Sequence, residues 1–249
     1  MTGKKGRVIV VGDSHALYSY AAVHGAKIFM FAGCTMHRVA RDGIQSLLPA
    51  GFCVSAADVV IVSCGDVDCR MHIKRQSAIK GWSIDDEIDD ICKRFSVAVH
   101  LFGQETKCAL AVSCIVPLNP TILSTSWSDE MTVEEATMIR AKMNSKLQLT
   151  GYPFIDFRQA FSNDDGTFKD GMSDNGVHVD PRQTMPAIDA LNLATGLNLR
   201  YSKPPYPVHL LLETRSEKLA RTAKTILRFP DKHIWRPVRN YAKRITGRN

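Results

Sequence analysis

The stretch VIVVGDSHALYSY, residues 8–20, begins as a strand and turns abruptly into a polar corner. Residues 8–11 are an unbroken run of β-branched apolar side chains, which is typical of a strand covered on both faces in a parallel sheet. Residues 16–24 are compatible with a helix, so Gly12, Asp13, Ser14 and His15 lie where a strand gives way to a helix. Ligands of open α/β sheets bind at the carboxyl ends of the strands. We therefore expect functional side chains at this corner.

The remaining pattern continues the alternation of strand and helix. Four more strands are predicted at residues 26–33, 57–65, 108–117 and 152–157, with a polar, glycine-bearing loop after the second. Helices are predicted at residues 83–104, from Thr132 with a capping box to Glu135, and at 183–195 with Gly196 as its stop. This order indicates an α/β protein whose five-stranded parallel sheet carries helices on both faces, a three-layer sandwich.

Composition sets the broad class of the protein. The 249 residues are 45% hydrophobic and 23% charged, as in ordinary globular proteins. The chain has no apolar run of the ~20 residues needed to span a bilayer and no recognisable secretory signal. Its seven cysteines include no CxxC pair, which favours reduced thiols in a cytoplasmic protein over disulfides or a zinc site.

Positive charge is concentrated at the carboxyl end of the chain. Residues 203–249 contain twelve basic and three acidic side chains, a net +9, so that the rest of the chain carries −2 of the total of +7. We expect an α/β domain at residues 1–200, a proline-rich linker at 201–212 and a basic amphipathic helical tail at 213–249. Such a tail suits an anionic membrane surface or packs on the domain with its basic face in water. Nucleic acid is the less favoured partner, because the tail has few aromatic side chains for stacking.

Four short blocks resemble the SGNH, or GDSL-type, hydrolases: GDSH at 12–15, the glycine of FMFAGC, the block CGDVDCR at 64–70, and GMSDNGVHVD at 171–180. The resemblance covers roughly residues 7–197. It implies a flavodoxin-like α/β/α fold and a hydrolase that works through an acyl-enzyme. It also makes Ser14 the nucleophile and His178 the base that takes its proton. Without that family, Asp13 or Ser14 could simply cap the helix.

The carboxylate that orients His178 is ambiguous. The family places an aspartate three residues before the histidine, where this chain has Asn175. Asp174 stands four before and Asp180 two after. We favour Asp174, because a shift of one residue in the loop would let it take this role, whereas an asparagine would orient the ring without stabilising an imidazolium.

The oxyanion hole departs from the family pattern. Gly33 matches the glycine whose N–H points into that hole, but Val67 stands where the family has asparagine. The loss of one donor costs about 2.7–4 kcal/mol of transition-state stabilisation, so a replacement such as Arg70 is expected. The string GDVDCRMHI also resembles an uncharacterised branch with the signature GEIDCR-x-HI.

Further polar residues are expected to shape the substrate pocket, namely His15, Asp68, Arg70 and His72. His15, His37 and His72 lack the spacing of metal ligands, and we expect neither a metal nor a cofactor. By analogy with relatives that carry the GDSH block, the resemblance implies a serine esterase acting on an acylated sugar or glycan. A glycan O-acyltransferase and a binding protein without turnover remain alternatives.

Overall fold

The computed structural model describes residues 6–31, 33–123 and 131–202. Five parallel strands form one sheet in the order β2-β1-β3-β4-β5. They are β1 (Val8–Gly12), β2 (Lys27–Met30), β3 (Val59–Ser63), β4 (Ala109–Ser113) and β5 (Phe154–Ile155). The predicted five-stranded parallel sheet, and with it the predicted fold class, is confirmed.

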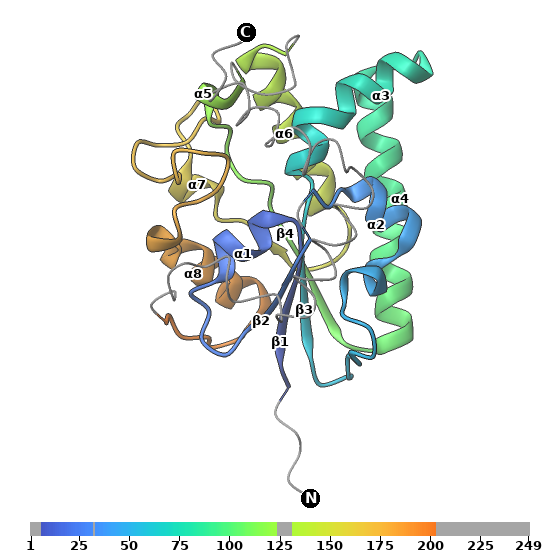
Figure 1. Cartoon of the computed structure of the whole chain (residues 1–249), viewed down its shortest axis with the longest axis vertical. Helices are drawn as coiled ribbons and strands as arrows, with labels where there is room; N and C mark the ends of the chain where they lie inside the picture. Colours follow the sequence, from blue (N-terminus) through green and yellow to red (C-terminus); the bar gives the residue numbers. More distant parts are fainter. Residues whose placement is uncertain (1–5, 32, 124–130, 203–249) are drawn as a thin grey trace, which may run out of the picture. The chain divides into compact units, whose positions relative to one another are not determined.

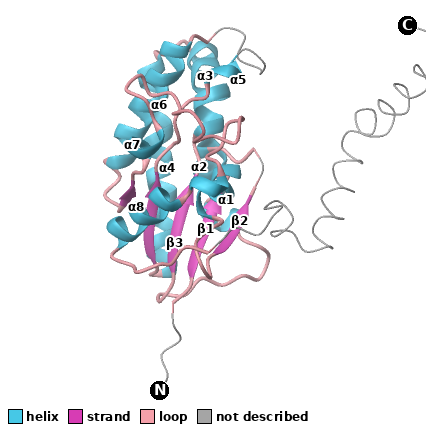
Figure 2. Ribbon diagram, turned by 90° about the vertical axis from the view of Figure 1, so that its left-hand side faces the viewer, coloured by secondary structure: helices cyan, strands magenta, loops and turns pink. Residues whose placement is uncertain are grey.

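Helices cover both faces of the sheet (Figures 1 and 2). The main helices are α1 (Ser14–Tyr20), α2 (Met36–Asp42), α3 (Ile73–Lys80), α4 (Ile84–Thr106), α6 (Val133–Gln148) and α8 (Met185–Thr195). Short turns of helix lie at α5 (Pro120–Leu123), α7 (Arg158–Phe161), η1 (Ile44–Leu47), η2 (Asp68–His72) and η3 (Pro181–Gln183). One face carries α2, α4 and α6, and the opposite face carries α1 and α8.

The buried core explains why the strands carry apolar side chains on both faces. On one face, Ile9 and Val60 pack in a cluster with Ile91 and Phe95 of α4. The intervening Val10 is as fully buried as Ile9, because a strand points successive side chains to opposite faces. Both faces of the sheet are therefore excluded from water.

Gly12 allows the first strand to end tightly against β3. A Cβ at this position would lie 1.7 Å from the carbonyl oxygen of Ser63, and the residue has φ +155°. Asp13 N then donates to the same carbonyl oxygen at 3.0 Å. The absence of a side chain thus places the polar corner directly above the sheet.

Helix ends follow the predicted caps. Thr132 and Glu135 form the reciprocal capping box at the start of α6, and Gly196 ends α8 in the left-handed conformation. Ser83 caps α4, and the Asp86 side chain completes a second box. Each cap is formed by residues only a few positions apart in the chain, so it can be predicted from the sequence.

Some predicted boundaries were wrong. Helix α1 begins at Ser14 itself and ends at Tyr20, because the Asp13 side chain accepts from His15 N and caps it. The region after β2 is not only a loop but contains α2, whose first turn is capped by Thr35. After β3, the π-helical turn η2 leads into α3. Helices α2 and α3 were not predicted because they are too short to show the recurring apolar spacing that marks the longer helices.

The predicted linker and tail fall almost entirely outside the described residues. Tyr201 and Ser202, at the start of the predicted linker, belong to the domain edge: Ser202 N donates to Ala22 O at 2.7 Å, and Tyr201 forms an isolated bridge with Val23. No helix among the described residues is long and apolar enough to cross a bilayer.

Candidate active site

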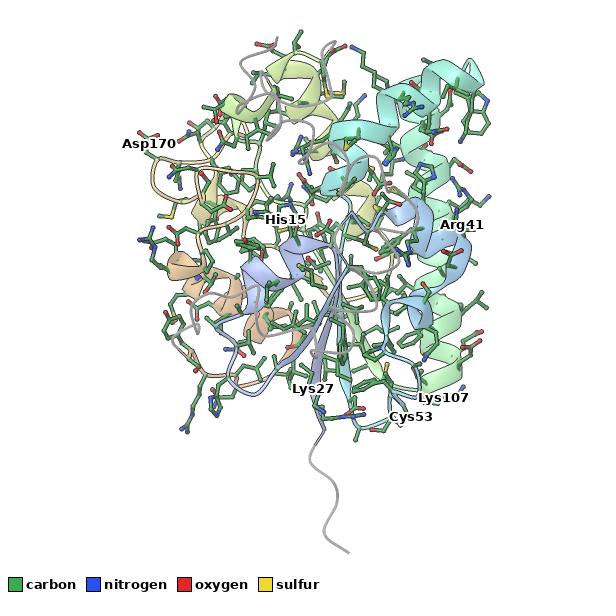
Figure 3. The ribbon with its side chains drawn as sticks, viewed as in Figure 1. His15, Lys27, Arg41, Cys53, Lys107 and Asp170 are labelled. Carbon is green, nitrogen blue, oxygen red and sulfur yellow. The ribbon has the colours of Figure 1, made fainter. Side chains whose placement is uncertain are left out.

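The site lies at the carboxyl ends of the central strands. Figure 3 shows His15 at that edge, whereas Lys27, Cys53 and Lys107 lie at the opposite end of the sheet. Ser14 is the first residue of α1, directly after β1 and its Asp13 cap. A parallel sheet brings the ends of distant strands to one rim, so a serine from the first crossover can meet residues of the last loop.

The structure brings Ser14 and His178 together. His178 Nε2 lies 2.8 Å from Ser14 Oγ, and His178 Nδ1 lies 2.8 Å from Asp174 Oδ2. Because the carboxylate accepts only, Nδ1 carries the proton and Nε2 is left to accept from the serine hydroxyl. The three side chains form one continuous hydrogen-bonded path from hydroxyl to carboxylate.

The loop around Asp174 is fastened by its own backbone. Asp174 Oδ1 accepts from Gly176 N at 2.8 Å and from His178 N at 3.1 Å. Asn119 Nδ2 holds the loop from outside by donating to Gly176 O at 2.9 Å. The carboxylate that contacts the imidazole is thereby fixed in position before any substrate arrives.

Burial and neighbouring charges set the protonation of this pair. Burial lowers the pKa of His178, and the nearby His15 lowers it further, against the opposing effect of Asp174. Burial acts to raise the pKa of Asp174, but the hydrogen bond from His178 outweighs it and the pKa is lowered overall. His178 is therefore neutral and Asp174 ionised near neutral pH, as proton abstraction requires.

One turn of α1 clamps the imidazole as well as supplying the serine. The ring of Tyr18 stacks on that of His178 at a centroid distance of 3.9 Å and an interplanar angle of 9°. The ring of His15 lies on another side, 4.9 Å from His178 and tilted by 50°. Ser14, His15 and Tyr18 all face the base because residues one turn apart share a helix face.

A buried charge cluster lies next to this clamp. Asp66 Oδ2 lies 3.1 Å from His15 Nε2 and accepts from Arg70 Nε at 2.6 Å, while Asp66 Oδ1 accepts from Arg140 Nη2 at 2.8 Å. Burial alone would raise the pKa of Asp66, but His15 and Arg140 hold it well below its ordinary range. Conversely, burial opposes a charge on His15, and Asp66 and Asp13 outweigh it, so the pKa of His15 is raised.

Asp13 is also completely buried at this corner. Its Oδ1 accepts from His15 N at 2.8 Å, and burial raises the pKa of its carboxyl to about 6. The residue therefore caps the helix that carries Ser14 and adds a titratable group behind the nucleophile.

Asp68 does not line an accessible pocket, contrary to expectation. Its carboxylate is completely buried and accepts from Met36 N at 2.6 Å, at the start of α2. Burial raises the pKa of Asp68 to about 7. The residue thus secures the helix that follows the Gly33 loop, which is a positioning role within the fold.

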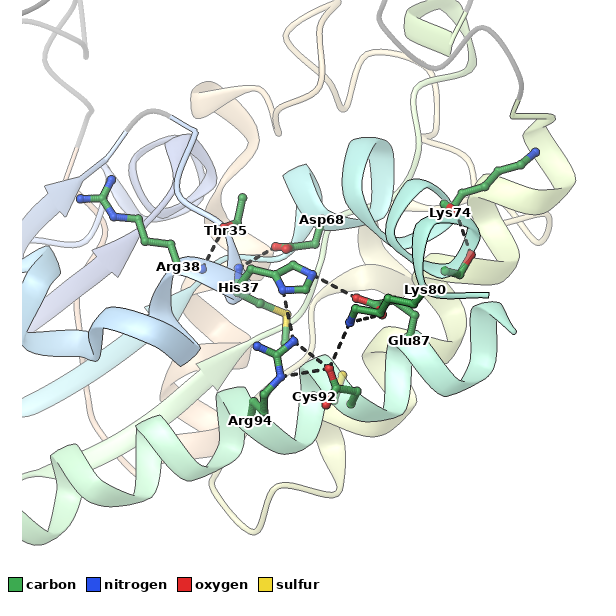
Figure 4. A network of polar contacts seen from close by, with 12 residues as sticks. Thr35, His37, Arg38, Asp68, Lys74, Lys80, Glu87, Cys92 and Arg94 are labelled. Carbon is green, nitrogen blue, oxygen red and sulfur yellow. Dashed lines mark hydrogen bonds and ion pairs between the residues drawn. The ribbon is translucent and has the colours of Figure 1, made fainter. Parts of the chain in front are cut away.

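His72 belongs to a different cluster, also contrary to expectation. Its ring lies 6.2 Å from that of His37, a residue of α2 whose side chain contacts α4 (Figure 4). His37 Nδ1 is 3.2 Å from Arg94 Nη2, and His37 Nε2 is 3.3 Å from the buried carboxylate of Glu87. This network joins α2 to α4, and none of its hydrogen bonds or ion pairs among the described residues involves Ser14.

Gly33 and Asn175 are exposed, and both have positive φ values of 72° and 62°. Gly33 lies in the loop between β2 and α2, with open space where a Cβ would stand. The side chain of Asn175 makes no hydrogen bond with the described residues, and Asp180 pairs with Arg182 instead. Asp174 is thus the acidic residue of this loop that contacts the imidazole.

Sequence reasoning missed Tyr18, Asp66 and Arg140 as parts of the site. Tyr18 stands four residues after Ser14, so a helix predicted to begin at Ser14 would have placed both side chains on one face. Asp66 and Arg140 come from different elements, and nothing in their local sequence pairs them. Within the described ranges, no group of three or more His, Cys, Asp or Glu side chains could hold a metal ion.

Comparison with known proteins identifies the fold. No protein-family model matches the sequence, and no curated protein is significantly similar to it. A solved structure from Streptococcus pneumonia, named for a platelet activating factor, is 11% identical, with a TM-score of 0.54 over 77% of this chain and 85% of that one. A GDSL-like lipase from Bacteroides thetaiotaomicron is 14% identical, with a TM-score of 0.50 over 79% of this chain and 88% of that one. The chain therefore has an SGNH-like fold, and the resemblance seen in its sequence is confirmed at that level.

Proposed function

We propose that this protein is a serine esterase that removes an acyl group from a carbohydrate through an acyl-enzyme. The observation that carries the proposal is the path from Ser14 Oγ through both nitrogens of His178 to Asp174, with 2.8 Å at each step. A serine hydroxyl is a weak nucleophile until a base takes its proton, and this path supplies both the base and its orienting carboxylate. The sugar part of the proposal rests on the resemblance of GDSH to esterases that carry the same block.

The reaction follows from these contacts. Ser14 Oγ attacks the acyl carbon while His178 Nε2 takes its proton, and Asp174 stabilises the resulting imidazolium. Collapse of the tetrahedral intermediate breaks the bond to the alcohol oxygen, which receives the proton from Nε2. A water molecule then gives a proton to the same nitrogen, attacks the acyl-serine and releases the acid. His178 and Ser14 are restored.

Backbone groups would hold the negative oxygen. Neither Ser14 N–H nor Gly33 N–H donates a hydrogen bond to any described residue, so both are available as donors. Val67 has no side-chain donor, and among the described residues Arg70 bonds to Asp66 through Nε and makes no hydrogen bond to Ser14 or His178. We therefore assign the oxyanion hole to the two backbone groups, with the charged surroundings of His15 supplementing them.

A serine-reactive fluorophosphonate tests the nucleophile. We expect the wild-type protein to be labelled, Ser14→Ala to remain unlabelled, and Ser145→Ala to be labelled normally, because Ser145 lies on the exposed side of α6. Failure to label the wild type would favour a binding protein without turnover. Acetate release from acetylated oligosaccharides, with and without acceptor sugars, then separates hydrolysis from O-acyl transfer.

A further inference from the structure

Two buried carboxylates that follow β3 contact different parts of the candidate site. Asp66 and Asp68 stand two residues apart, and Asp68 begins the π-helical turn η2. The Asp66 carboxylate lies beside His15, next to the base. The Asp68 carboxylate instead accepts from Met36 N, at the first residue of α2, at 2.6 Å (Figure 4). One short stretch of chain therefore contacts both the surroundings of the base and the helix that follows the Gly33 loop.

Asp68 differs from other buried carboxylates of the domain because it lacks a basic partner. Asp66 is paired with Arg140, and Asp58 is paired with Arg7. Among the described residues, no basic side chain forms a hydrogen bond or ion pair with Asp68, and its Oδ1 has no hydrogen-bond partner. Burial of a carboxylate without a cation opposes folding. Charge pairing therefore does not explain Asp68, and its contact with α2 is the feature that needs a role.

Helix α2 already has a side-chain cap of its own. Thr35 Oγ1 accepts from Arg38 N at 3.0 Å, which satisfies one N–H group of the first turn. Met36 N–H is a further donor at the same end of the helix, and Asp68 supplies its acceptor from 32 positions away in the sequence. The contact therefore does more than cap a helix, because it fixes the start of α2 to the turn after β3.

The loop that carries Gly33 is anchored on both sides. Before it, Phe31 N donates to Gly12 O at 2.8 Å, directly below the corner that bears the nucleophile. After it, Met36 N is held by Asp68. Gly33 lies between these two anchors with φ +72°. The direction of its N–H group therefore depends on where the two anchors place the loop.

We propose that Asp68 is a positioning residue for catalysis: through Met36 N it holds the loop whose Gly33 N–H binds the oxyanion. The inference rests on the proposed esterase function and deepens it. Because Val67 offers no side-chain donor, the oxyanion depends on two backbone N–H groups, and the placement of each has a large effect on the rate. Loss of the Asp68 acceptor leaves nucleophile and base in contact but lets the Gly33 N–H move away from the oxyanion.

The test compares three variants by steady-state hydrolysis of a chromogenic acetate ester. We expect Asp68→Ala to lower kcat by about 10–10²-fold and to change KM by less than about threefold, because a misplaced donor weakens binding of the transition state alone. Asp68→Asn keeps an acceptor oxygen for Met36 N and should retain kcat within about threefold of the wild type. Asp58→Ala is the matched control: it removes a buried carboxylate just before β3, at the opposite end of the sheet, so it should destabilise the protein without lowering kcat.

Inhibition by phenylboronic acid measures the oxyanion hole more directly, because its adduct with Ser14 carries an anionic oxygen. We expect Asp68→Ala to weaken inhibition by about the same factor as it lowers kcat/KM, and Asp68→Asn to be inhibited like the wild type. Circular dichroism and urea unfolding establish that each variant is folded. If the alanine variant does not fold, Asp68→Ser replaces it, because a serine hydroxyl is one bond shorter than the carboxylate and does not reach Met36 N.

The outcomes separate this proposal from the esterase proposal. A folded Asp68→Ala protein with the kcat of the wild type, or an asparagine variant as impaired as the alanine variant, overturns the positioning role and leaves the esterase intact. A similar loss of kcat in Asp58→Ala also overturns it, because general loosening of the domain would then explain both losses. If a fluorophosphonate does not label the wild type, the esterase proposal fails, and the positioning role fails with it.

Discussion

Asp174 Oδ2 accepts a hydrogen bond from His178 Nδ1 at 2.8 Å, and the two residues lie four positions apart in one loop. The base and its orienting carboxylate are therefore presented as a single local unit, fastened by the backbone N–H groups of Gly176 and His178. The proposed nucleophile, Ser14, comes from a distant part of the sequence, 164 positions before His178. When this loop packs against the edge of the sheet, the hydrogen-bonded path from Ser14 through His178 to Asp174 is complete.

Asp174→Asn should lower kcat by about 10³–10⁴-fold, because an amide selects the wrong tautomer of His178 and removes the charge that stabilises the imidazolium. Steady-state hydrolysis of a chromogenic acetate ester measures this loss. Asn175→Gly is the matched control, since glycine keeps the positive φ of 62° at that position. A comparable loss in the control would transfer the orienting role to Asn175.

The pH profile of kcat/KM should reflect the lowered pKa of His178. Proton abstraction needs the neutral imidazole, so activity rises with pH through this pKa, and the midpoint should lie below ~6.5, the ordinary value for histidine. His15→Asn removes a neighbouring positive charge and should move the midpoint to higher pH. A midpoint unchanged in an active His15→Asn protein would show that His15 carries no charge beside the base.

Tyr18→Ala should reduce kcat about threefold to tenfold, because the stacked ring no longer holds His178 in its orientation. Tyr18→Phe preserves the ring and should retain most of the activity. The two variants are compared by kcat and by the rate of fluorophosphonate labelling. If Phe is as damaging as Ala, the hydroxyl and not the stacking is what matters.

Gly12→Ala should destabilise the domain by about 3 kcal/mol or more, because the new Cβ would collide with the backbone of Ser63. Urea denaturation provides the free energy of unfolding. Gly25→Ala is the control: its Cβ would meet open space, so only the strain of φ +76° remains, ~1–2 kcal/mol. Equal losses in the two variants would mean that conformational strain, and not the close approach, dominates at Gly12.

The basic tail, which lies outside the described residues, suggests a binding experiment. We expect liposomes containing anionic lipid to retain the full chain more strongly than a chain ending at Ser202, because residues 203–249 carry a net charge of +9. Retention should weaken as salt is added. Neutral liposomes serve as the reference. Equal retention of both chains on anionic liposomes would argue against a membrane role for the tail.

Local signals in the sequence were sufficient for the five strands, the long helices α4, α6 and α8, the caps at Thr132 and Gly196, and the polar corner at Ser14, but not for the short helices α2 and α3. Each depends on residues within a turn or two of one another, so periodicity and capping chemistry express them directly. The same reasoning placed Asp68 and His72 in the pocket, because it followed nearness in sequence. Their side chains instead face the start of α2 and the vicinity of His37.

The tertiary structure decides which distant groups meet: the family resemblance proposed Ser14 and His178 as partners, whereas nothing in the sequence pairs Asp66 with Arg140. Ser14 and His178 are 164 positions apart, and Asp66 and Arg140 are 74 apart, yet both pairs lie within 2.8 Å. The tertiary structure also places Asp174, and not Asn175, against the imidazole. The Asp174 carboxylate accepts from backbone N–H groups of its own loop, and this local fold cannot be read from the number of residues that separate Asp174 from His178. Sequence patterns predict contacts between residues that are near one another in the chain. The candidate active site instead depends on parallel crossovers, which bring remote segments to one edge of the sheet.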